Sequence, residues 1–281
     1  MKHAWLIIAH NEFDVLRQLI FMLDSPESDF YIHFDKKLGS LPKLHVQSGH
    51  LIVLEERIDV RWGTVSQIET ELLLFETALK HGGYSFYHLL SGTHLPLVPL
   101  TELSAFYASH SGEEIMRFWP EDPGDADFKL RRYHFPLRDF KSVSPARRAL
   151  CQKTWTAVLK VQKILGIRHL KDKVFFKTDN WLSLSEKACR FLVDQKAPIL
   201  KKYRWSFCGD EYFVASELMD KKTDFRIFNC SNLLYVEFLN DSPKSFTLDQ
   251  YPSLQKQGFL WARKFTSLKT PEVSTISKTD K

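Results

Sequence analysis

AWLIIAHNE, at residues 4–12, is the stretch that decides the fold class of this 281-residue chain. Its apolar part, residues 4–10, is continuous rather than alternating, which is typical of a strand buried on both faces of a parallel sheet. The period then changes, because Asn11 is a suitable N-cap and the next apolar residues recur at helical spacing: Leu16, Leu19, Ile20 and Leu23. The stretch therefore predicts a buried strand that leads directly into a helix.

The same alternation continues through the first hundred residues. Apolar runs at residues 29–34, 51–54 and 84–90 predict three further buried strands. Residues 64–81 predict an amphipathic helix, whose apolar face carries Val65, Ile68, Leu72, Phe75 and Leu79. This pattern indicates an α/β fold with a mostly parallel central sheet and helices on both faces, and such sheets bind ligands at the carboxyl ends of their strands.

The rest of the chain is less regular. Strands are expected at 114–118 and 233–238, and helices at 146–165, 185–193 and 210–218. The proline-rich stretch 119–145 is expected as a long ordered loop. The helix at 146–165 has a basic face, which suits either an acidic membrane or water.

These elements suggest one domain over residues 1–268. We expect a nucleotide-binding half at 1–100 and an acceptor-binding and catalytic half at 101–268. Residues 269–281 are rich in Ser, Thr and Lys, so we expect a loose polar tail there.

Composition and charge exclude several classes of protein. The 39 Lys and Arg residues exceed the 34 Asp and Glu residues by only five, and a nucleic-acid binder would gather a denser basic stripe on one element. The small excess suits a protein that binds a phosphorylated small molecule or rests lightly on an anionic membrane face. The apolar runs are much shorter than the roughly 20 residues of a membrane span. With no secretory signal and no CxxC spacing among the four cysteines, we expect a cytoplasmic protein.

Polar residues close three of the predicted strands. His10-Asn11, Asp35-Lys36 and Ser91-Gly92 stand where the strands at the centre of the sheet would end. The carboxyl ends of parallel strands meet at one edge, so these side chains predict a nucleotide-sized cleft. The alternative is that strand ends are polar because they meet water.

Two consecutive acids, Asp210 and Glu211, follow an aromatic run and precede a predicted helix. A carboxylate among aromatic rings is partly desolvated, which raises its pKa and makes it a better proton acceptor. The alternative is that both acids simply favour the positive end of the helix dipole.

Lys244 and the pair Arg263-Lys264 are candidate ligands for a diphosphate, since fixed cations stabilise the charge of a departing nucleoside diphosphate. The alternative is that they are solvated surface residues. Asp125-Ala126-Asp127 has the D-x-D form that holds Mg²⁺ or Mn²⁺ in many sugar-nucleotide enzymes, but its place in the expected loop argues against a metal site. Motifs such as G-x-G-x-x-G, H-E-x-x-H and G-x-S-x-G are absent from the sequence.

Seven motifs occur in one order between residues 3 and 266. They are AWLIIAHNE, DFYIHFDKK, RWGTVSQIETELLL, FYHLLSGTHLPL, WLSLS, FCGDEYF and FLWARKF. Together they resemble the core-2/I-branching β-1,6-N-acetylglucosaminyltransferase family in its compact bacterial form, a family related to the peptide O-xylosyltransferases.

The resemblance implies a glycosyltransferase A-type fold that transfers a sugar from a UDP-sugar to a glycan hydroxyl, with inversion and without a metal or other cofactor. It makes Glu211 the catalytic base and places the two diphosphate contacts at Lys264 and Lys244. Further donor contacts are expected at His10, Asp35, Arg61, Trp62, Ser91 and Arg263. Acceptor contacts are expected at Glu114, Trp181 and Asp210.

The sequence departs from the family pattern at three places. His94 replaces the aspartate of S-G-x-D-L-P, Gly209 stands where proline is usual, and KTDNW at 177–181 differs from Gly-Ser-x-Trp. These changes touch the donor or acceptor pocket, so they leave the exact sugar open. UDP-N-acetylglucosamine leads among the expected donors, and UDP-xylose and UDP-galactose follow. The expected acceptor is a glycan or lipid-linked glycan of surface polysaccharide, reached from the cytoplasmic side of the inner membrane. The alternatives are a non-catalytic nucleotide- or glycan-binding module, or a metal-dependent transferase of the same fold.

Overall fold

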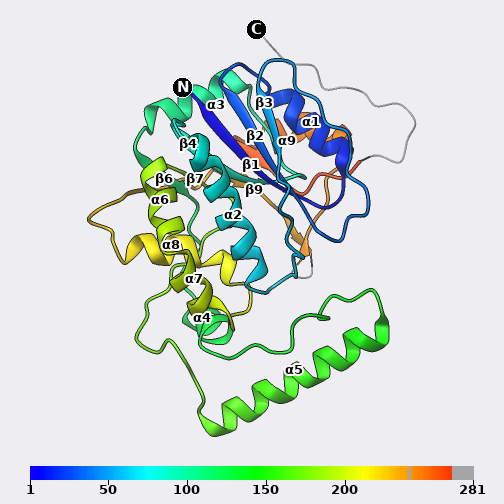
Figure 1. Cartoon of the computed structure of the whole chain (residues 1–281), viewed down its shortest axis with the longest axis vertical. Helices are drawn as coiled ribbons and strands as arrows, with labels where there is room; N and C mark the ends of the chain where they lie inside the picture. The colour runs from blue at the N-terminus through cyan, green and yellow to red at the C-terminus, as the bar shows by residue number, and fades with distance from the viewer. Residues whose placement is uncertain (240–241, 268–281) are drawn as a thin grey trace.

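The computed structural model describes residues 1–239 and 242–267. A seven-stranded sheet, of order β3-β2-β1-β4-β7-β6-β8, forms its centre (Figure 1). The first four strands along the chain are parallel: β1 (His3–Ala9), β2 (Ser28–Phe34), β3 (His50–Val53) and β4 (Phe86–Ser91). The short β7 (Ser183–Leu184) is antiparallel to β4 and to β6 (Glu113–Met116), and β8 (Arg226–Asn229) runs parallel to β6. The predicted α/β fold with a mostly parallel central sheet is confirmed.

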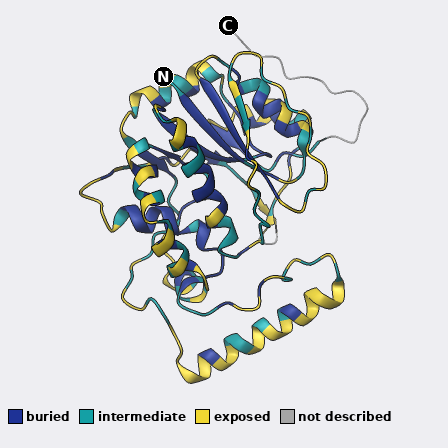
Figure 2. Cartoon of the chain, in the orientation of Figure 1, coloured by how far each residue is buried: buried dark blue, intermediate teal, exposed yellow. Residues whose placement is uncertain are grey.

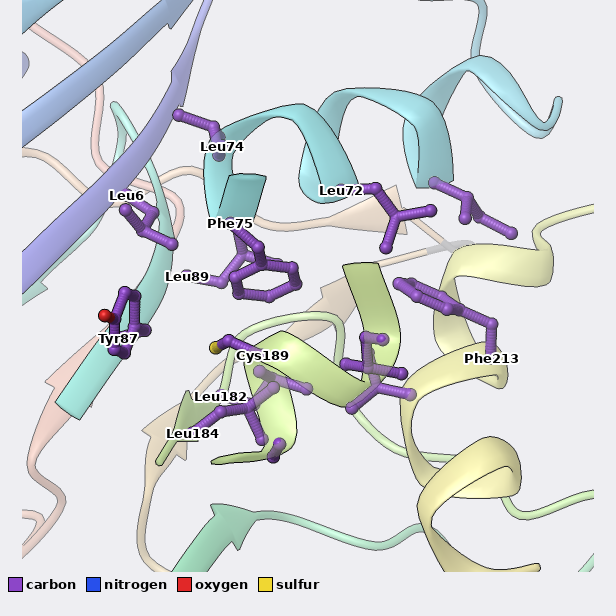
Figure 3. Packing of buried hydrophobic residues seen from close by; sticks show 14 of the residues in the cluster. Leu6, Leu72, Leu74, Phe75, Tyr87, Leu89, Leu182, Leu184, Cys189 and Phe213 are labelled. Carbon is purple, nitrogen blue, oxygen red and sulfur yellow. The ribbon is translucent and has the colours of Figure 1, made fainter. Parts of the chain in front are cut away.

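Helices cover both faces of this sheet, and the strands divide their side chains between two cores. On one face lie α2 (Ser66–His81), α6 (Glu186–Asp194), α7 (Lys196–Tyr203) and α8 (Phe213–Met219). Figure 3 shows Leu89 of the sheet beside Phe75 of α2, with Leu6 nearby, and all three belong to the core on this face. On the other face lie α1 (Phe13–Leu23), α3 (Leu100–Ser109) and α9 (Tyr251–Gln255). Successive strand residues point to opposite faces, and both faces are covered, which explains why β1 is apolar from Ala4 to Ala9.

Four local predictions are wrong. The N-cap of α1 is Glu12 rather than Asn11, and no side-chain cap bond is formed there. The stretch predicted as a long loop contains α4 (Pro123–Leu130), whose N-cap Asp122 accepts hydrogen bonds from the backbone amides of Gly124 and Asp125. The late strand is divided into β9 (Leu234–Tyr235) and β10 (Phe238–Leu239). Asp210 begins no α-helix, because it lies in a 3₁₀ turn (Gly209–Glu211) ahead of α8.

The last described segment returns to the sheet. After β11 (Ser242–Pro243) and a 3₁₀ turn (Leu248–Gln250), β12 (Trp261–Ala262) pairs with both β9 and β5 (Leu95–Pro96). The indole of Trp261 is buried and donates to the Tyr107 hydroxyl at 3.1 Å. This pairing carries Arg263 and Lys264 back beside the strand ends. The polar tail predicted at 269–281 lies outside the described residues.

Helix α5 (Pro145–Leu165) lies along the edge of the molecule, apart from the sheet (Figure 1). Its inner face is held by Trp155, whose ring lies 5.1 Å from that of Phe140 and 5.6 Å from that of Phe207. Most of its other residues are exposed (Figure 2). None of the helices in the described part of the chain combines the length and apolar character needed to cross a membrane.

Candidate active site

The turn that carries Glu211 is fixed by close packing. Cys208 adopts a left-handed backbone conformation with φ of 50°, and its amide donates to the carbonyl of Gly63 at 3.0 Å. A Cβ at Gly209 would lie 3.3 Å from the side chains of Ile68, Ser206 and Tyr203, which is tighter than usual van der Waals contact. Glycine in place of the proline of the family pattern therefore fits this crowded turn.

The Glu211 carboxylate is held by one of its oxygens. Its Oε2 accepts from the Lys129 ammonium at 2.7 Å and lies 3.7 Å from that of Lys177. Among the described residues, no side chain bonds the other oxygen, Oε1, and the side chain is 30% exposed. Although desolvation opposes it, the Glu211 charge raises the pKa of Lys129, so this lysine stays charged. One oxygen is thus anchored, while no described side chain bonds the other.

Asp125 belongs to the same cluster of charges, although the sequence predicted it in a long loop. Its Oδ2 accepts from Lys177 at 2.7 Å and from the Tyr212 hydroxyl at 2.6 Å, and lies 3.2 Å from Lys129. Helix α4 makes these contacts possible, because it brings a segment predicted as a loop against the Gly209–Glu211 turn. Although burial opposes the change, the hydrogen bonds from Lys177 and Tyr212 lower the pKa of Asp125.

The two carboxylates of the D-x-D motif have different partners. Asp127 pairs with Arg132 at 3.2 Å and with Arg168 at 3.3 Å, whereas Asp125 faces the lysines beside Glu211. No group of three or more His, Cys, Asp or Glu side chains is gathered as a metal site within residues 1–239 and 242–267.

Asp210 belongs to the same Gly209–Glu211 turn, but its side chain is buried. Its Oδ2 accepts from the Gln67 amide at 2.6 Å and from the Asn180 amide, while its Oδ1 has no partner. Burial, with the neighbouring Glu211 charge, raises its pKa to about 7. Glu71 is also fully buried nearby, and burial together with Asp210 raises its pKa well above the ordinary value. Asp210 therefore supports the turn from inside, and its predicted acceptor contact gains no support from this position.

The predicted donor residues gather at the ends of β1 and β2. Desolvation lowers the pKa of His10, and the next largest effects come from Lys264, which lowers it, and Asp35, which raises it. Lys264 has its own pKa lowered by desolvation and by Arg263. Because such effects require proximity, the structure brings His10, Asp35, Arg263 and Lys264 together. Of these four, Asp35 forms an ion pair, to Lys37 at 2.7 Å.

Lys244 is near this group through the backbone, since the amide of Lys264 faces its carbonyl at 3.5 Å. Its exposed ammonium turns instead to Glu237, at 2.8 Å. The structure therefore places Lys264, more than Lys244, among the donor candidates.

Arg61 and Trp62 lie between the donor candidates and the Gly209–Glu211 turn. The Arg61 guanidinium pairs with Asp59 at 2.7 Å. Trp62 is 41% exposed, its ring packs edge-on against Phe207, and the Lys141 ammonium lies 3.5 Å from its centroid. Lys141 affects the pKa of both Lys264 and Cys208, so it connects the donor group with the turn.

Ser91 and His94 form a closed turn after β4. The Ser91 backbone amide donates to Nδ1 of His94 at 3.0 Å, and the Nε2 atom of His94 is buried without a partner. The Trp181 ring lies 4.9 Å from the His94 ring on one side and 4.9 Å from the Arg263 guanidinium on another. Burial lowers the pKa of Arg263 to about 10. The His94 departure thus stands beside the donor cations, and Trp181 lies there too, although we predicted it as an acceptor contact.

Glu114 is directed elsewhere. Its oxygens accept from the amide of Ser185 at 2.8 Å and from its hydroxyl at 2.6 Å, and the residue is buried. Since Ser185 is the N-cap of α6, the carboxylate stabilises the start of that helix. The geometry gives no support to its predicted acceptor contact.

Several residues of the site are missing from the sequence prediction: Gln67, Lys129, Lys141, Lys177 and Asn180. Two of them, Lys177 and Asn180, fall in the KTDNW segment that departs from the family pattern. That departure from the family pattern was the signal in the sequence that could have pointed to these two residues. The backbone of this segment bonds to the turn, because the Thr178 amide donates to the Glu211 carbonyl at 2.9 Å.

Comparison with known proteins supplies the family. The model of the family described as Core-2/I-Branching enzyme matches residues 3–242, which is most of the chain and includes Glu211 but neither Lys244 nor Lys264. A comparison with curated proteins finds no match. Together with the mostly parallel sheet, this match shows that the chain belongs to the core-2/I-branching enzyme family and is a glycosyltransferase.

Proposed function

We propose that this glycosyltransferase moves N-acetylglucosamine from its UDP derivative to a glycan hydroxyl, with inversion and without a divalent metal. The acceptor oxygen attacks the anomeric carbon opposite the diphosphate. The bond from that carbon to the diphosphate oxygen breaks, UDP leaves with the electron pair, and Glu211 takes the proton of the hydroxyl. A lipid-linked glycan of a surface polysaccharide is the proposed acceptor.

One observation carries the proposal: Glu211 is anchored at Oε2 by Lys129 while Oε1 is unbonded by any described side chain. A general base needs an oriented carboxylate with an oxygen free to reach the proton. The turn supplies the orientation, because hydrogen bonds hold its backbone at two points. The Cys208 amide donates to the Gly63 carbonyl, and the Thr178 amide donates to the Glu211 carbonyl.

The cations near the strand ends support the diphosphate part of the proposal. Desolvation and the positive charge of Arg263 both lower the pKa of Lys264. Gathering like charges is unfavourable unless an anion binds between them. A leaving diphosphate would be such an anion, and fixed cations stabilise its charge without reorganisation.

Lysine partners also support transfer without a metal. Oδ2 of Asp125 accepts from Lys177 and Tyr212, and Asp127 pairs with Arg132 and Arg168. Binding a divalent ion by both carboxylates would require these ion pairs to break.

The direct test is the variant Glu211→Gln, assayed for transfer with UDP-N-acetylglucosamine, UDP-xylose and UDP-galactose. General base catalysis contributes about 10²–10⁴-fold, so turnover should fall by that factor while UDP still binds. The matched control is Glu76→Gln, because Glu76 is a surface glutamate held by a single lysine, Lys196, at the same 2.7 Å. Near-normal transfer by Glu211→Gln would contradict the assignment. UDP binding by the unaltered chain without any product would favour the non-catalytic module.

A second assay tests the role of metal. Transfer measured in EDTA should equal transfer in its absence. Collapse on chelation, restored by Mn²⁺ and lost again in Asp125→Asn, would instead indicate a metal-dependent transferase.

A further inference from the structure

The outer face of α5 has no role in the site described above. Its inner face packs through Trp155 on Phe140 and Phe207, so the helix is fixed to the body from one side. Figure 2 shows the helix exposed along most of its length at the edge of the molecule. A helix that packs on the body with one face and exposes the other to solvent presents a surface for a partner.

That bare face carries an apolar stripe. Leu150, Ala157, Val161 and Ile164 recur at intervals of seven, four and three positions, which places them on one side of a helix. Leu150 is 68% exposed and Ile164 is 82% exposed. Single exposed apolar residues are common, but a continuous stripe of them marks an interaction surface.

Positive charge surrounds the stripe. Lys153 and Lys160 are exposed along one side of it. The segment between Asp139 and Asp172 contains eight of the chain's 39 Lys and Arg residues and none of its 34 acids. The remaining residues hold 31 basic against 34 acidic side chains, so the net positive charge of the chain comes entirely from this segment.

A basic cavity continues this charge from α5 toward the body. It has a volume of about 540 Å³ and lies at the C-terminal end of α5, where its cations are Arg131, Arg132, Lys163, Arg168 and Lys171. Asp127 is its one acidic lining residue. Such a cavity suits a phosphate group, which accepts charge-assisted hydrogen bonds from several cations.

We propose that α5 docks on the surface of an anionic lipid bilayer. The apolar stripe enters the boundary between headgroups and acyl chains, Lys153 and Lys160 contact headgroup phosphates, and the basic cavity receives a further headgroup. An apolar helix face flanked by lysines is the pattern of interfacial helices. A second copy of the chain fits this face poorly, because it would bring two acid-free basic segments together.

The position of α5 gives this docking a use that rests on the proposed function. Phe207, on which Trp155 packs, is followed directly by Cys208 and the catalytic turn. A bilayer bound at α5 would therefore lie close to the turn that carries Glu211, where a lipid-linked acceptor has to present its hydroxyl. Vesicle binding itself requires neither donor nor acceptor, so its failure and the failure of transfer are separate results.

The test is sedimentation of the full chain with vesicles. We expect binding to vesicles of phosphatidylcholine mixed with phosphatidylglycerol, and at least tenfold weaker binding to phosphatidylcholine alone. Raising the salt from about 0.1 M to about 1 M shortens the Debye length from about 10 Å to about 3 Å and should release the protein. Leu150→Glu with Ile164→Glu, and separately Lys153→Glu with Lys160→Glu, should each reduce binding at least tenfold.

Matched variants separate the stripe from general surface effects. Leu41→Glu with Leu239→Glu alters two other exposed leucines, and Lys221→Glu with Lys222→Glu makes the same charge change elsewhere. Both pairs should bind vesicles like the unaltered chain, and circular dichroism should show all variants folded. Equal binding to both vesicle types, no effect of the α5 variants, or a dimer in light scattering that only the stripe variants dissociate would overturn the proposal.

Discussion

Asp210 and Glu211 are consecutive acids in opposite environments. Glu211 lies at the surface beside Lys129, whereas Asp210 is buried, with its pKa raised to about 7 by desolvation and by Glu211. Neighbouring carboxylates whose surroundings separate their proton affinities commonly divide a chemical task. Here Glu211 can meet a substrate, and Asp210 holds the turn through Gln67 and Asn180.

The raised pKa of Asp210 makes the stability of the protein depend on pH. Between about pH 4 and pH 7 the folded chain keeps a proton that the unfolded chain has released, so this contribution to stability is complete below pH 4 and is lost as the pH rises to 7. In Asp210→Asn this loss is absent. Urea unfolding from pH 4 to pH 8 should show the free energy of unfolding of the unaltered chain falling relative to the variant by more than about 1 kcal/mol. Parallel profiles, like those expected for the exposed Asp194→Asn, would contradict the prediction.

The two candidate diphosphate lysines are distinguished by their surroundings. Lys264 lies among donor candidates, while the Lys244 ammonium is exposed and paired with Glu237. A charge-assisted hydrogen bond contributes about 1.5–3 kcal/mol, so Lys264→Ala should weaken UDP binding by about tenfold to a hundredfold in calorimetry. Lys244→Ala, the matched control, should weaken it less. The reverse order would move the diphosphate toward Lys244.

At the scale of elements, α4 and α5 supply or support the side chains around the Gly209–Glu211 turn. Helix α4 presents Lys129 and Asp125 to Glu211, and α5 supports Phe207 through Trp155. The sequence predicted the second helix and not the first. Helix α4 is short and contains Pro123 and Gly124, which are turn signals, and its Asp122 cap becomes informative only once the helix is known.

The packing of Trp155 gives a prediction about α5. Its ring contacts Phe128, Phe140 and Phe207, and its indole nitrogen donates to His134 at 3.0 Å. Trp155→Ala should lower the free energy of unfolding by about 2 kcal/mol, less than for a fully buried aromatic, and should also lower turnover because Phe207 loses its support. Trp155→Phe should keep most of both. Urea unfolding and transfer assays check this, and an unchanged turnover in the alanine variant would show that α5 does not support the turn.

The whole molecule is held together by the return of the chain to its own sheet. The core that packs on α1 contains residues from β1 and β2 together with Trp261 and Phe265, more than two hundred positions later. Strand β12 pairs with β5 and β9, and it delivers Arg263 and Lys264 to the strand ends. The fold and the proposed donor site therefore depend on the same segment.

Truncation tests this dependence. A chain ending at residue 242, where the family match ends, lacks Phe246, Trp261 and Phe265, all buried in that core. Leaving their places empty should cost several kcal/mol, which is comparable to the whole stability of a domain. We expect this chain to be unfolded by circular dichroism and unable to bind UDP, whereas a chain ending at Ser267 should keep both properties. A folded chain of 242 residues would show that the return of the chain is dispensable.

The sequence by itself determined the β-α alternation, the mostly parallel central sheet and the family. Continuous apolar runs and helical spacing are local properties, and they require no knowledge of distant residues. Glu211 was proposed as the base before the fold was known, because FCGDEYF, which carries it, is one of the consecutive-residue motifs that resemble the family.

Only the tertiary structure decided which side chains accompany Glu211 and which do not. Lys129 and Lys177 reach it from segments separated by many residues, and Glu114 is withdrawn to cap α6. No local pattern reports these distances, because the energy of an ion pair depends on where folding brings two charges. The partners of Glu211 were therefore a property of the packed molecule.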